Sequence, residues 1–272
     1  MSIQEKFEEN AEFTYGVHAG YMAEHIKDNA ATIMDPSTAK AFLKKLDGGM
    51  MGSVRSLNQK LNLLRQAIAY NLPYKFAPDG TVLFLVYQRN KLNNEGQLTM
   101  KLSLAPAGHV TNFDVKNYFT VDEDRDPLET EIICLTETLY HNLGREFGEE
   151  VELTSQAYSD EHNGKVRQAL EQVATDNAYP IGFVMDSKPD PKFVGNIHFG
   201  AIFASYIPYS DTTFEMKEEH NTAIGWASAV QLLDHVNGVQ SISEGAFFEP
   251  WSTMIIQNIA EVVGTIKAVA GL

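Results

Sequence analysis

Residues 145–150 read Arg145-Glu146-Phe147-Gly148-Glu149-Glu150, and their acidic side chains recur at a helical interval. In a helix, Glu146, Glu149 and Glu150 stand at i, i+3 and i+4 and share one face. Three carboxylates on one turn repel one another, and a hard divalent cation would relieve that repulsion. Arg145 lies four residues before Glu149 and can orient it. The hexapeptide therefore indicates a Mg²⁺-binding site. The alternative is an ordinary solvated helix face.

The sequence before the hexapeptide predicts the helix that carries it. Asp126-Pro127-Leu128-Glu129 is typical of a helix start, with an N-cap aspartate, proline at the first helical position and a capping-box glutamate. From there apolar residues keep a helical spacing at Leu128, Ile132, Leu135, Leu139, Leu143 and Phe147. We therefore predict one long helix that begins at Pro127, carries Glu137 in its middle and ends in the acidic hexapeptide.

Strand patterns lie on both sides of this helix. Residues 81–87 are β-branched and aromatic, and apolar residues alternate with polar ones from Leu98 to Leu104. After the helix, residues 181–184 and 197–207 have strand-like composition. Helices are predicted at 165–174, 223–235 and 249–269, with a polar loop at 211–221. This order predicts an α/β fold in which helices cover a mixed sheet.

The first 72 residues are predicted to form a helical N-terminal extension. Asp35-Pro36 begins a helix that runs through Leu46, and Gly48-Gly49 ends it. A second helical stripe runs through Leu57, Leu61, Leu64 and Ile68. We therefore divide the chain into an extension, residues 1–72, and a second domain, residues 73–272.

Composition limits the classes of function. The 272 residues include 36 Asp+Glu against 21 Lys+Arg, a net charge of −15, which disfavours binding to nucleic acid or anionic membranes. Cys134 is the single cysteine, so an internal disulfide is excluded and a reducing compartment is indicated. The polar start is unlike a secretory signal, and residues 254–272 are interrupted by charges. We expect a soluble, cytoplasmic protein.

These patterns resemble the Nudix (MutT-like) hydrolase superfamily. Its signature ends in Arg-Glu-apolar-x-Glu-Glu-x-Gly-apolar, which residues 145–153 match except for Glu152, where glycine is usual. Glu137 stands at the distance of the earlier signature glutamate. Glu131 occupies the place of the first signature glycine, which it cannot imitate. On the predicted helix, Glu137 would lie half a turn from the Glu146 face, so its match carries little weight.

A second set of patterns supports the same resemblance. Ala107-Gly108-His109-Val110 is similar to a Gly-Gly-His-apolar turn common in the family, which makes Gly108 the predicted equivalent of the signature glycine. Residues 111–126 would then be an insertion inside the signature, as in some larger members. Further similar segments bring the resemblance to about residues 80–260: residues 87–89, residues 195–203 and residues 249–252.

The resemblance implies Mg²⁺-dependent hydrolysis of a diphosphate linkage in a nucleoside diphosphate derivative, such as a nucleotide, dinucleotide or nucleotide sugar. Mn²⁺ is the alternative cofactor. A divalent ion neutralises phosphoryl oxygens and activates water, and glutamates suit such an ion. By resemblance Glu146 and Glu150 are ligands, and Glu149 is a ligand or the catalytic base. The backbone carbonyl of Gly108 adds a contact.

Other residues complete the predicted site. The family draws a further carboxylate from a later segment, for which Glu218, Glu219, Glu215 and Glu249 are candidates; for any single one of them, an ordinary surface acid is the preferred alternative. Arg89 and His109 are predicted to contact the substrate. A solvated strand edge is the alternative for Arg89, and a structural histidine is the alternative for His109 and the preferred role for His198.

Two readings of function remain open from the sequence. The favoured one is a pyrophosphohydrolase, in which Glu146, Glu149 and Arg145 are catalytic. The alternative is a catalytically weak or inactive Nudix-fold protein that binds a nucleotide or a protein partner. Glu152 and the missing local glycine leave room for the second. The N-terminal region could also form the interface of a homodimer.

Overall fold

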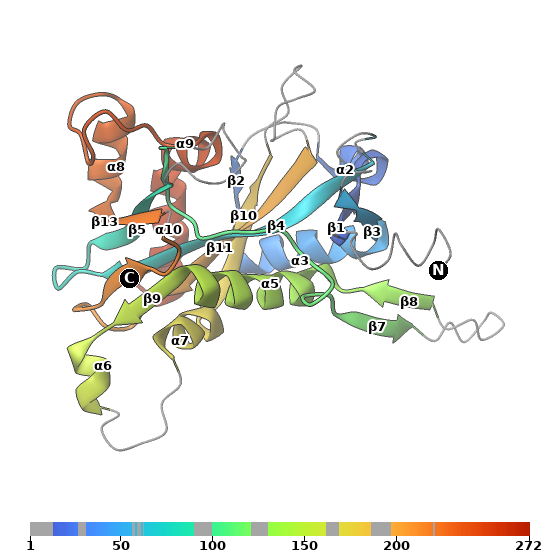
Figure 1. The fold of residues 1–272 in the computed structure, drawn as a ribbon, viewed down its shortest axis with the longest axis horizontal. Helices are drawn as coiled ribbons and strands as arrows, with labels where there is room; N and C mark the ends of the chain where they lie inside the picture. Colours follow the sequence, from blue (N-terminus) through green and yellow to red (C-terminus); the bar gives the residue numbers. More distant parts are fainter. Residues whose placement is uncertain are drawn as a thin grey trace.

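A computed structural model describes most of the chain: residues 13–26, 31–55, 58, 61, 63–89, 100–120, 130–161, 169–185, 197–219 and 221–272. Its centre is a nine-stranded mixed sheet with the main order β13-β5-β4-β11-β10-β2 (Figure 1). β4 and β11 are parallel, and the other pairs along this path are antiparallel. The path consists of β13 (Asn221–Ser228), β5 (Val82–Arg89), β4 (Leu64–Phe76), β11 (His198–Tyr206), β10 (Ala178–Val184) and β2 (Ala31–Ile33).

Three short strands join this sheet beside its main path, and two separate two-stranded sheets lie outside it. β1 pairs with β3 and β4, and β6 pairs with β5. β7 pairs with β8 between the 107–110 turn and the acidic helix, and β9 pairs with β12. Their bounds are β1 (Phe13–His18), β3 (Met50–Val54), β6 (Leu102–Ser103), β7 (Asn117–Thr120), β8 (Thr130–Ile133), β9 (Val151–Thr154) and β12 (Thr213–Met216).

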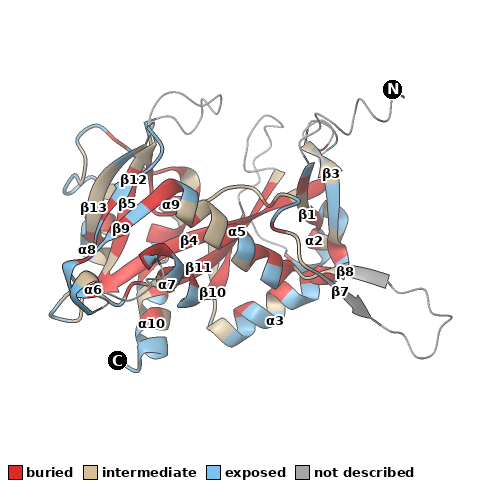
Figure 2. Cartoon of the chain, turned by 60° about the horizontal axis from the view of Figure 1, so that its bottom comes forward, coloured by how far each residue is buried: buried red, intermediate tan, exposed pale blue. Residues whose placement is uncertain are grey.

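Helices cover both faces of the sheet. β4 shows the division, because Tyr70, Leu72 and Tyr74 pack with the C-terminal helices while Ala67 and Ala69 pack with the acidic helix. α8, α9 and α10 cover the first face, and α3, α5 and α7 cover the second (Figures 1 and 2). The helices are α2 (Ala19–His25), α3 (Pro36–Leu46), α5 (Leu135–Glu150), α6 (Gln156–Glu161), α7 (Leu170–Asp176), α8 (Ala229–Val236), α9 (Pro250–Gln257) and α10 (Ile259–Ala270).

Several predicted elements are confirmed. The predicted strands at 81–87, 181–184 and 197–207 correspond to β5, β10 and β11. The predicted helix from Pro36 through Leu46 is α3, and Asp35 accepts hydrogen bonds from the Ser37 and Thr38 backbone N–H groups at 3.0 Å. The strand predicted from Leu98 is present only as β6, because residues 90–99 lie outside the described part of the chain.

The prediction of a helical N-terminal extension is wrong. β1, β2 and β3 are strands, and β4 begins at Leu64, inside the second predicted helical stripe. β4 is buried on both faces, so its apolar residues are nearly continuous and match a helical interval by coincidence. The predicted division at residue 72 falls inside β4, which pairs with β11 along nine residue positions from Gln66 to Tyr74.

The predicted start of the acidic helix is also wrong. β8 occupies residues 130–133, and α5 begins at Leu135; residues 121–129 lie outside the described part. Cys134 provides no side-chain cap, and Asp47 Oδ1 instead accepts the Leu135 backbone N–H at 2.8 Å across 88 residues of sequence. Glu137 therefore lies exposed in the first turn of α5 rather than in its middle.

The C-terminal part needs three smaller corrections. The helix predicted at 223–235 is β13 followed by α8, and a strand, β12, lies in the predicted 211–221 loop. α7 covers only the end of the helix predicted at 165–174, since residues 162–168 lie outside the described part. The helix predicted at 249–269 breaks at Asn258 into α9 and α10, bent by 69°. No single described helix is long and apolar enough to span a membrane; by length and composition only, the bent α9–α10 pair might.

Candidate active site at the end of α5

The last turn of α5 carries the three predicted site acids at different depths. Glu150 is 8% exposed, the Glu146 side chain is 13% exposed, and the Glu149 side chain is 61% exposed. The C-terminal end of a helix has a partial negative charge, so acidic side chains are unfavourable there. No basic residue lies in this turn. Stabilising charge must therefore come from Arg145, one turn earlier, and from other elements.

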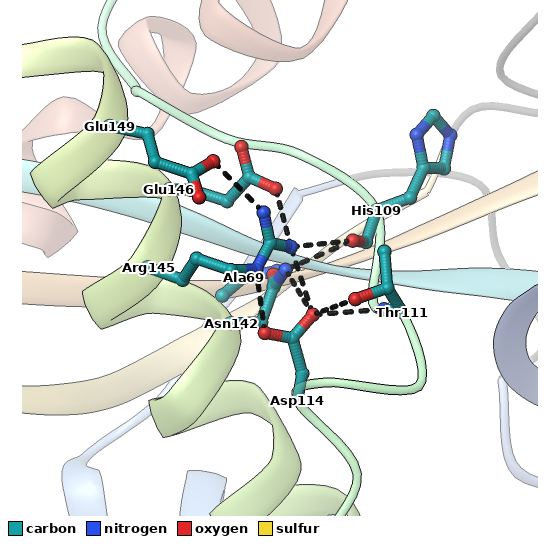
Figure 3. Close-up of polar contacts among 8 residues, drawn as sticks. All are labelled: Ala69, His109, Thr111, Asp114, Asn142, Arg145, Glu146 and Glu149. Atoms are coloured by element: carbon teal, nitrogen blue, oxygen red, sulfur yellow. Dashed lines mark hydrogen bonds and ion pairs between the residues drawn. The ribbon is translucent and has the colours of Figure 1, made fainter.

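Arg145 connects this turn to a buried acid that the sequence analysis did not identify. Its guanidinium makes a two-point contact with Asp114, Nε to Oδ1 and Nη2 to Oδ2, both at 2.9 Å (Figure 3). The same guanidinium lies 2.7 Å from Glu146 Oε1 and 3.1 Å from Glu149 Oε2. Burial opposes ionisation of Asp114, but hydrogen bonds from Arg145 and Thr111 lower the pKa of its carboxyl. Arg145 thus pairs with three carboxylates at once.

The 107–110 turn is held against α5 by a second buried residue, Asn142. Its Nδ2 donates to the His109 carbonyl at 3.1 Å, and its Oδ1 accepts the Ala69 backbone N–H of β4 at 3.1 Å. At Gly108, a Cβ would lie 2.2 Å from Glu146 Cδ. Any other residue at this position would displace the Glu146 carboxylate. The close approach of Glu146 therefore explains why a glycine stands at position 108.

The two more deeply placed glutamates resist ionisation. Burial raises the pKa of Glu146 to about 7, although Arg145 opposes the shift. Burial also raises the pKa of Glu150 to about 8; Arg89 opposes that shift, and Glu146, Glu218 and Glu149 add to it. Glu150 Oε2 is buried and makes no hydrogen bond within the described part of the chain. A buried acceptor without a partner is costly, which marks a position for a cation or a donor.

Arg89 faces the same region from the end of β5. Burial would lower its pKa, but Tyr87, Glu249 and Glu150 attract the charge and the net effect is a raised pKa. Its Nε is buried and, like Glu150 Oε2, makes no hydrogen bond within the described residues. Within the described residues, the Glu150 acceptor and the Arg89 donor thus both lack a hydrogen-bond partner, and the two side chains attract one another electrostatically.

The predicted histidines lie together beside the turn. His109 Nε2 and His198 Nε2 are 2.7 Å apart, so one ring must donate to the other. Burial, His198, Arg55 and Arg89 hold the pKa of His109 well below its usual range. His109 is thus neutral near pH 7 and can offer a hydrogen bond but no charge.

The candidate acids from later segments occupy different environments. Glu249 is 5% exposed, lies at the start of α9 and acts on the charge of Arg89. Glu218 is exposed, accepts from Asn221 Nδ2 at 2.9 Å and acts on Glu150. Glu219 and Glu215 are exposed, and Glu215 lies opposite Glu152 in the antiparallel β9–β12 pair.

The residues fit a divalent cation in chemistry but not in their present side-chain arrangement. Among the described residues, no three His, Cys, Asp or Glu side chains converge closely enough to hold a metal ion. Arg145 pairs with Glu146 and Glu149, so some of their oxygens face the guanidinium. Hard oxygen donors and the unbonded Glu150 Oε2 are the ligand type that Mg²⁺ or Mn²⁺ requires. Binding would require side-chain rotation, which is least hindered for exposed Glu149.

Sequence reasoning missed the residues that support the site. Asp114 and Asn142 act through tertiary contacts, and Asp114 belongs to the segment interpreted as an insertion. One local signal was available: Thr111 and Asp114 have the Ser/Thr-x-x-Asp/Glu spacing of a capping box, and Thr111 N–H and Oγ1 both donate to Asp114 Oδ2.

Comparisons with known proteins bear on the fold. No family model matches the chain, and no curated protein matches its sequence. Among solved structures, Tm1382, a candidate Nudix hydrolase, is 16% identical with a TM-score of 0.50, covering 92% of this chain and 99% of its own. A Nudix hydrolase from Alicyclobacillus acidocaldarius is 10% identical, with a TM-score of 0.41 and coverages of 73% and 96%. The similarity to Tm1382 shows that this chain has a Nudix-like mixed α/β fold.

Proposed function

We propose that the protein hydrolyses a diphosphate linkage in a nucleoside diphosphate derivative, with Mg²⁺ or Mn²⁺ held by carboxylates at the end of α5. The observation that carries this proposal is the group Glu146, Glu149 and Glu150 in one helical turn, with Glu150 Oε2 buried and without a hydrogen bond to any described residue. Keeping these acids at a helix C-terminus lowers stability, and a bound cation would reverse that cost.

Each residue has a distinct role in this proposal. Glu150 and Glu146 would hold the cation, which when bound neutralises phosphoryl oxygens and makes water a better nucleophile. Glu149, exposed and tethered to Arg145 at 3.1 Å, can accept the proton of the attacking water. Arg145 orients both Glu146 and Glu149, and the Gly108 backbone can approach Glu146 because it has no side chain.

The substrate contacts follow from charge and burial. Arg89 presents a guanidinium suited to a phosphate oxygen, and its Nε has no partner among the described residues. Neutral His109 would contribute a hydrogen bond. We also propose, as in the sequence analysis, that residues 111–126 are an insertion relative to other Nudix proteins. A cytoplasmic location and a homodimer belong to the same proposal.

A second candidate function is binding of a nucleotide or protein partner without turnover. The observation that favours it is the pairing of Glu146 and Glu149 with Arg145, together with the absence of a converged metal-binding set among the described residues. Glu152, which replaces the usual glycine, points the same way. In this second function, Arg145 stays paired with Glu146 and Glu149, so that these carboxylates do not bind a metal ion.

Glu149→Gln and Glu150→Gln separate the two functions. The test incubates the protein with Mg²⁺ and a panel of dinucleotides, nucleotide sugars and nucleoside triphosphates, and measures released phosphate and nucleoside monophosphate. Both variants should lose at least about a hundredfold in kcat/KM, because each removes a charge that acts on the reacting groups. Glu152→Gln is the matched control, since Glu152 is exposed on β9, and should keep its activity.

Other outcomes contradict the hydrolase proposal in specific ways. Turnover that is unchanged in both variants would place the chemistry elsewhere. Nucleotide binding by the wild-type protein, without hydrolysis of any compound in the panel, would favour the binding function.

A further inference from the structure

Glu249 and Arg89 are far apart in sequence, and each is connected to the strand pair β5–β6. Tyr87 and Ser103 are opposite one another in the β5–β6 pair, so their side chains lie on the same face of the sheet. Arg89 follows Tyr87 by two residues and shares that face. Ser103 Oγ donates to Glu249 Oε1 at 3.0 Å. Ser103 thus links the Glu249 carboxylate to the strand pair that carries Arg89, whose guanidinium lies over the Tyr87 ring, 5.8 Å from its centre.

Glu249 is held in place by contacts to several elements. It is the N-cap residue of α9, yet its side chain makes no capping hydrogen bond. Instead Oε1 accepts from Ser103, from Ser252 Oγ at 3.2 Å and from the Tyr70 hydroxyl of β4. Its backbone N–H donates to the Leu102 carbonyl at 2.9 Å. One oxygen with three donors and a carboxylate that is 5% exposed leave little freedom to reorganise around a metal ion.

Arg89 needs such a neighbour. A guanidinium that is buried at Nε, with no hydrogen bond there, is stabilised mainly by nearby negative charge. Glu249 attracts the Arg89 charge, and so does Glu150 when it is ionised. A cation on Glu150 would cancel the attraction from Glu150 and repel Arg89. Of these two acids, Glu249 would then be the one that keeps Arg89 in place.

We propose that Glu249 is a positioning residue that holds Arg89 toward an anionic group of the ligand, and that it is not a metal ligand. This inference rests on the proposed function, because it takes the end of α5 as the metal site and a diphosphate as the ligand. It differs from the sequence prediction, in which Glu249 was a candidate ligand.

The test measures metal and anion binding separately. Glu249→Gln keeps an acceptor for the three hydroxyls and removes the charge. Its Mn²⁺ affinity, measured by electron paramagnetic resonance without added ligand, should stay within about twofold of wild type. Its affinity for inorganic pyrophosphate, measured by calorimetry in EDTA, should fall about tenfold, as in Arg89→Gln. The Arg89→Gln/Glu249→Gln double variant should be no weaker than Arg89→Gln alone, because the two residues act as one unit.

Two further variants complete the design. Glu261→Gln removes an exposed charge on α10 and should bind pyrophosphate as wild type does. Glu249→Asp keeps the charge and should recover part of the pyrophosphate affinity, and it replaces Glu249→Gln if that variant does not fold.

Results that contradict the role of Glu249 can be told apart from results that contradict the proposed hydrolysis. Loss of Mn²⁺ binding in Glu249→Gln would make Glu249 a ligand and overturn the inference. Additive losses in the double variant, or no pyrophosphate binding by wild type in EDTA, would overturn it as well. A protein that hydrolyses nothing but shows the Glu249–Arg89 coupling would retain the inference and lose only the proposed reaction.

Discussion

At the scale of single residues, Arg145 organises the site. Its contact with Asp114 is a two-point ion pair, which fixes the plane of the guanidinium as well as its position. The remaining N–H groups then face Glu146 and Glu149. Asp114, which is 1% exposed, therefore sets how strongly Arg145 competes with a cation for the two glutamates.

Substituting Asp114→Asn tests that competition. Without the Asp114 charge, Arg145 should pair more strongly with Glu146 and Glu149, so Mg²⁺ should bind about tenfold more weakly. The Mg²⁺ dependence of hydrolysis and direct Mn²⁺ binding both report this change. Asp160→Asn, in which an exposed acid of α6 is altered, is the control. An unchanged Mg²⁺ requirement in Asp114→Asn would mean that Asp114 only stabilises the fold.

The raised pKa of Glu150 predicts opposite pH effects on stability and on metal binding. Between its ordinary value of 4.5 and about 8, the folded protein holds a proton that the unfolded chain has lost. Stability contributed by this group is thus present below pH 4.5 and falls as pH rises toward 8. Mg²⁺ binding should instead strengthen with rising pH, because the cation needs the carboxylate.

Glu150→Gln should consequently unfold at a higher temperature than metal-free wild type at pH 8, and the difference should shrink toward pH 5. Thermal unfolding followed by circular dichroism measures both. Equal unfolding temperatures of Glu150→Gln and metal-free wild type at pH 8 would show that ionised Glu150 does not destabilise the folded protein. Glu152→Gln serves again as the exposed control.

The sequence predicts part of this site for a clear reason. Glu146, Glu149 and Glu150 share a face because their spacing is local and helical, and the structure places them in one turn. Asp114 and Glu249 derive their roles from partners tens of residues away, so no local pattern identifies those roles.

At the scale of elements, α5 shows how far local signals reach. Its apolar stripe predicts the helix and its acidic end, but the capping motif at 126–129 places its start eight residues too early. β8 replaces the first predicted turns, and Asp47 supplies the cap from beside α3. The start of this helix is therefore decided by tertiary structure.

Asp47→Ala should destabilise the protein by about 1–2 kcal/mol, the usual cost of losing an N-cap. The loss should be larger if the other contacts of Asp47 also contribute. Asp47→Asn keeps an oxygen acceptor for the Leu135 N–H and should cost less. Urea unfolding measures both variants. Equal stabilities of Asp47→Ala and wild type would show that α5 does not depend on this cap.

At the scale of the whole molecule, the strands β1, β2 and β3 belong to the central sheet. β2 pairs with β10, β1 pairs with β4, and α3 packs in the same core as α5. The sequence suggests a separate extension because the buried strand β4 resembles a helical stripe. Long-range pairing, which no local window contains, decides the outcome.

Removing residues 1–63 should therefore abolish cooperative unfolding, since β10 would lose β2, β4 would lose β1, and α5 would lose α3 and the Asp47 cap. Calorimetry of the shortened chain measures this. Removing residues 270–272, which are exposed at the end of α10, is the control and should leave the transition intact. A shortened chain that still unfolds cooperatively would show that the N-terminal strands are dispensable.

The central claim is that the end of α5 binds a divalent cation. Its most direct test is the anomalous signal of Mn²⁺ in crystals soaked with MnCl₂ near pH 8, where Glu150 can ionise. We expect Mn²⁺ on Glu150, with at least one of Glu146 and Glu149 turned away from Arg145. Crystals with no Mn²⁺ at this turn, and with both ion pairs to Arg145 intact, would contradict it.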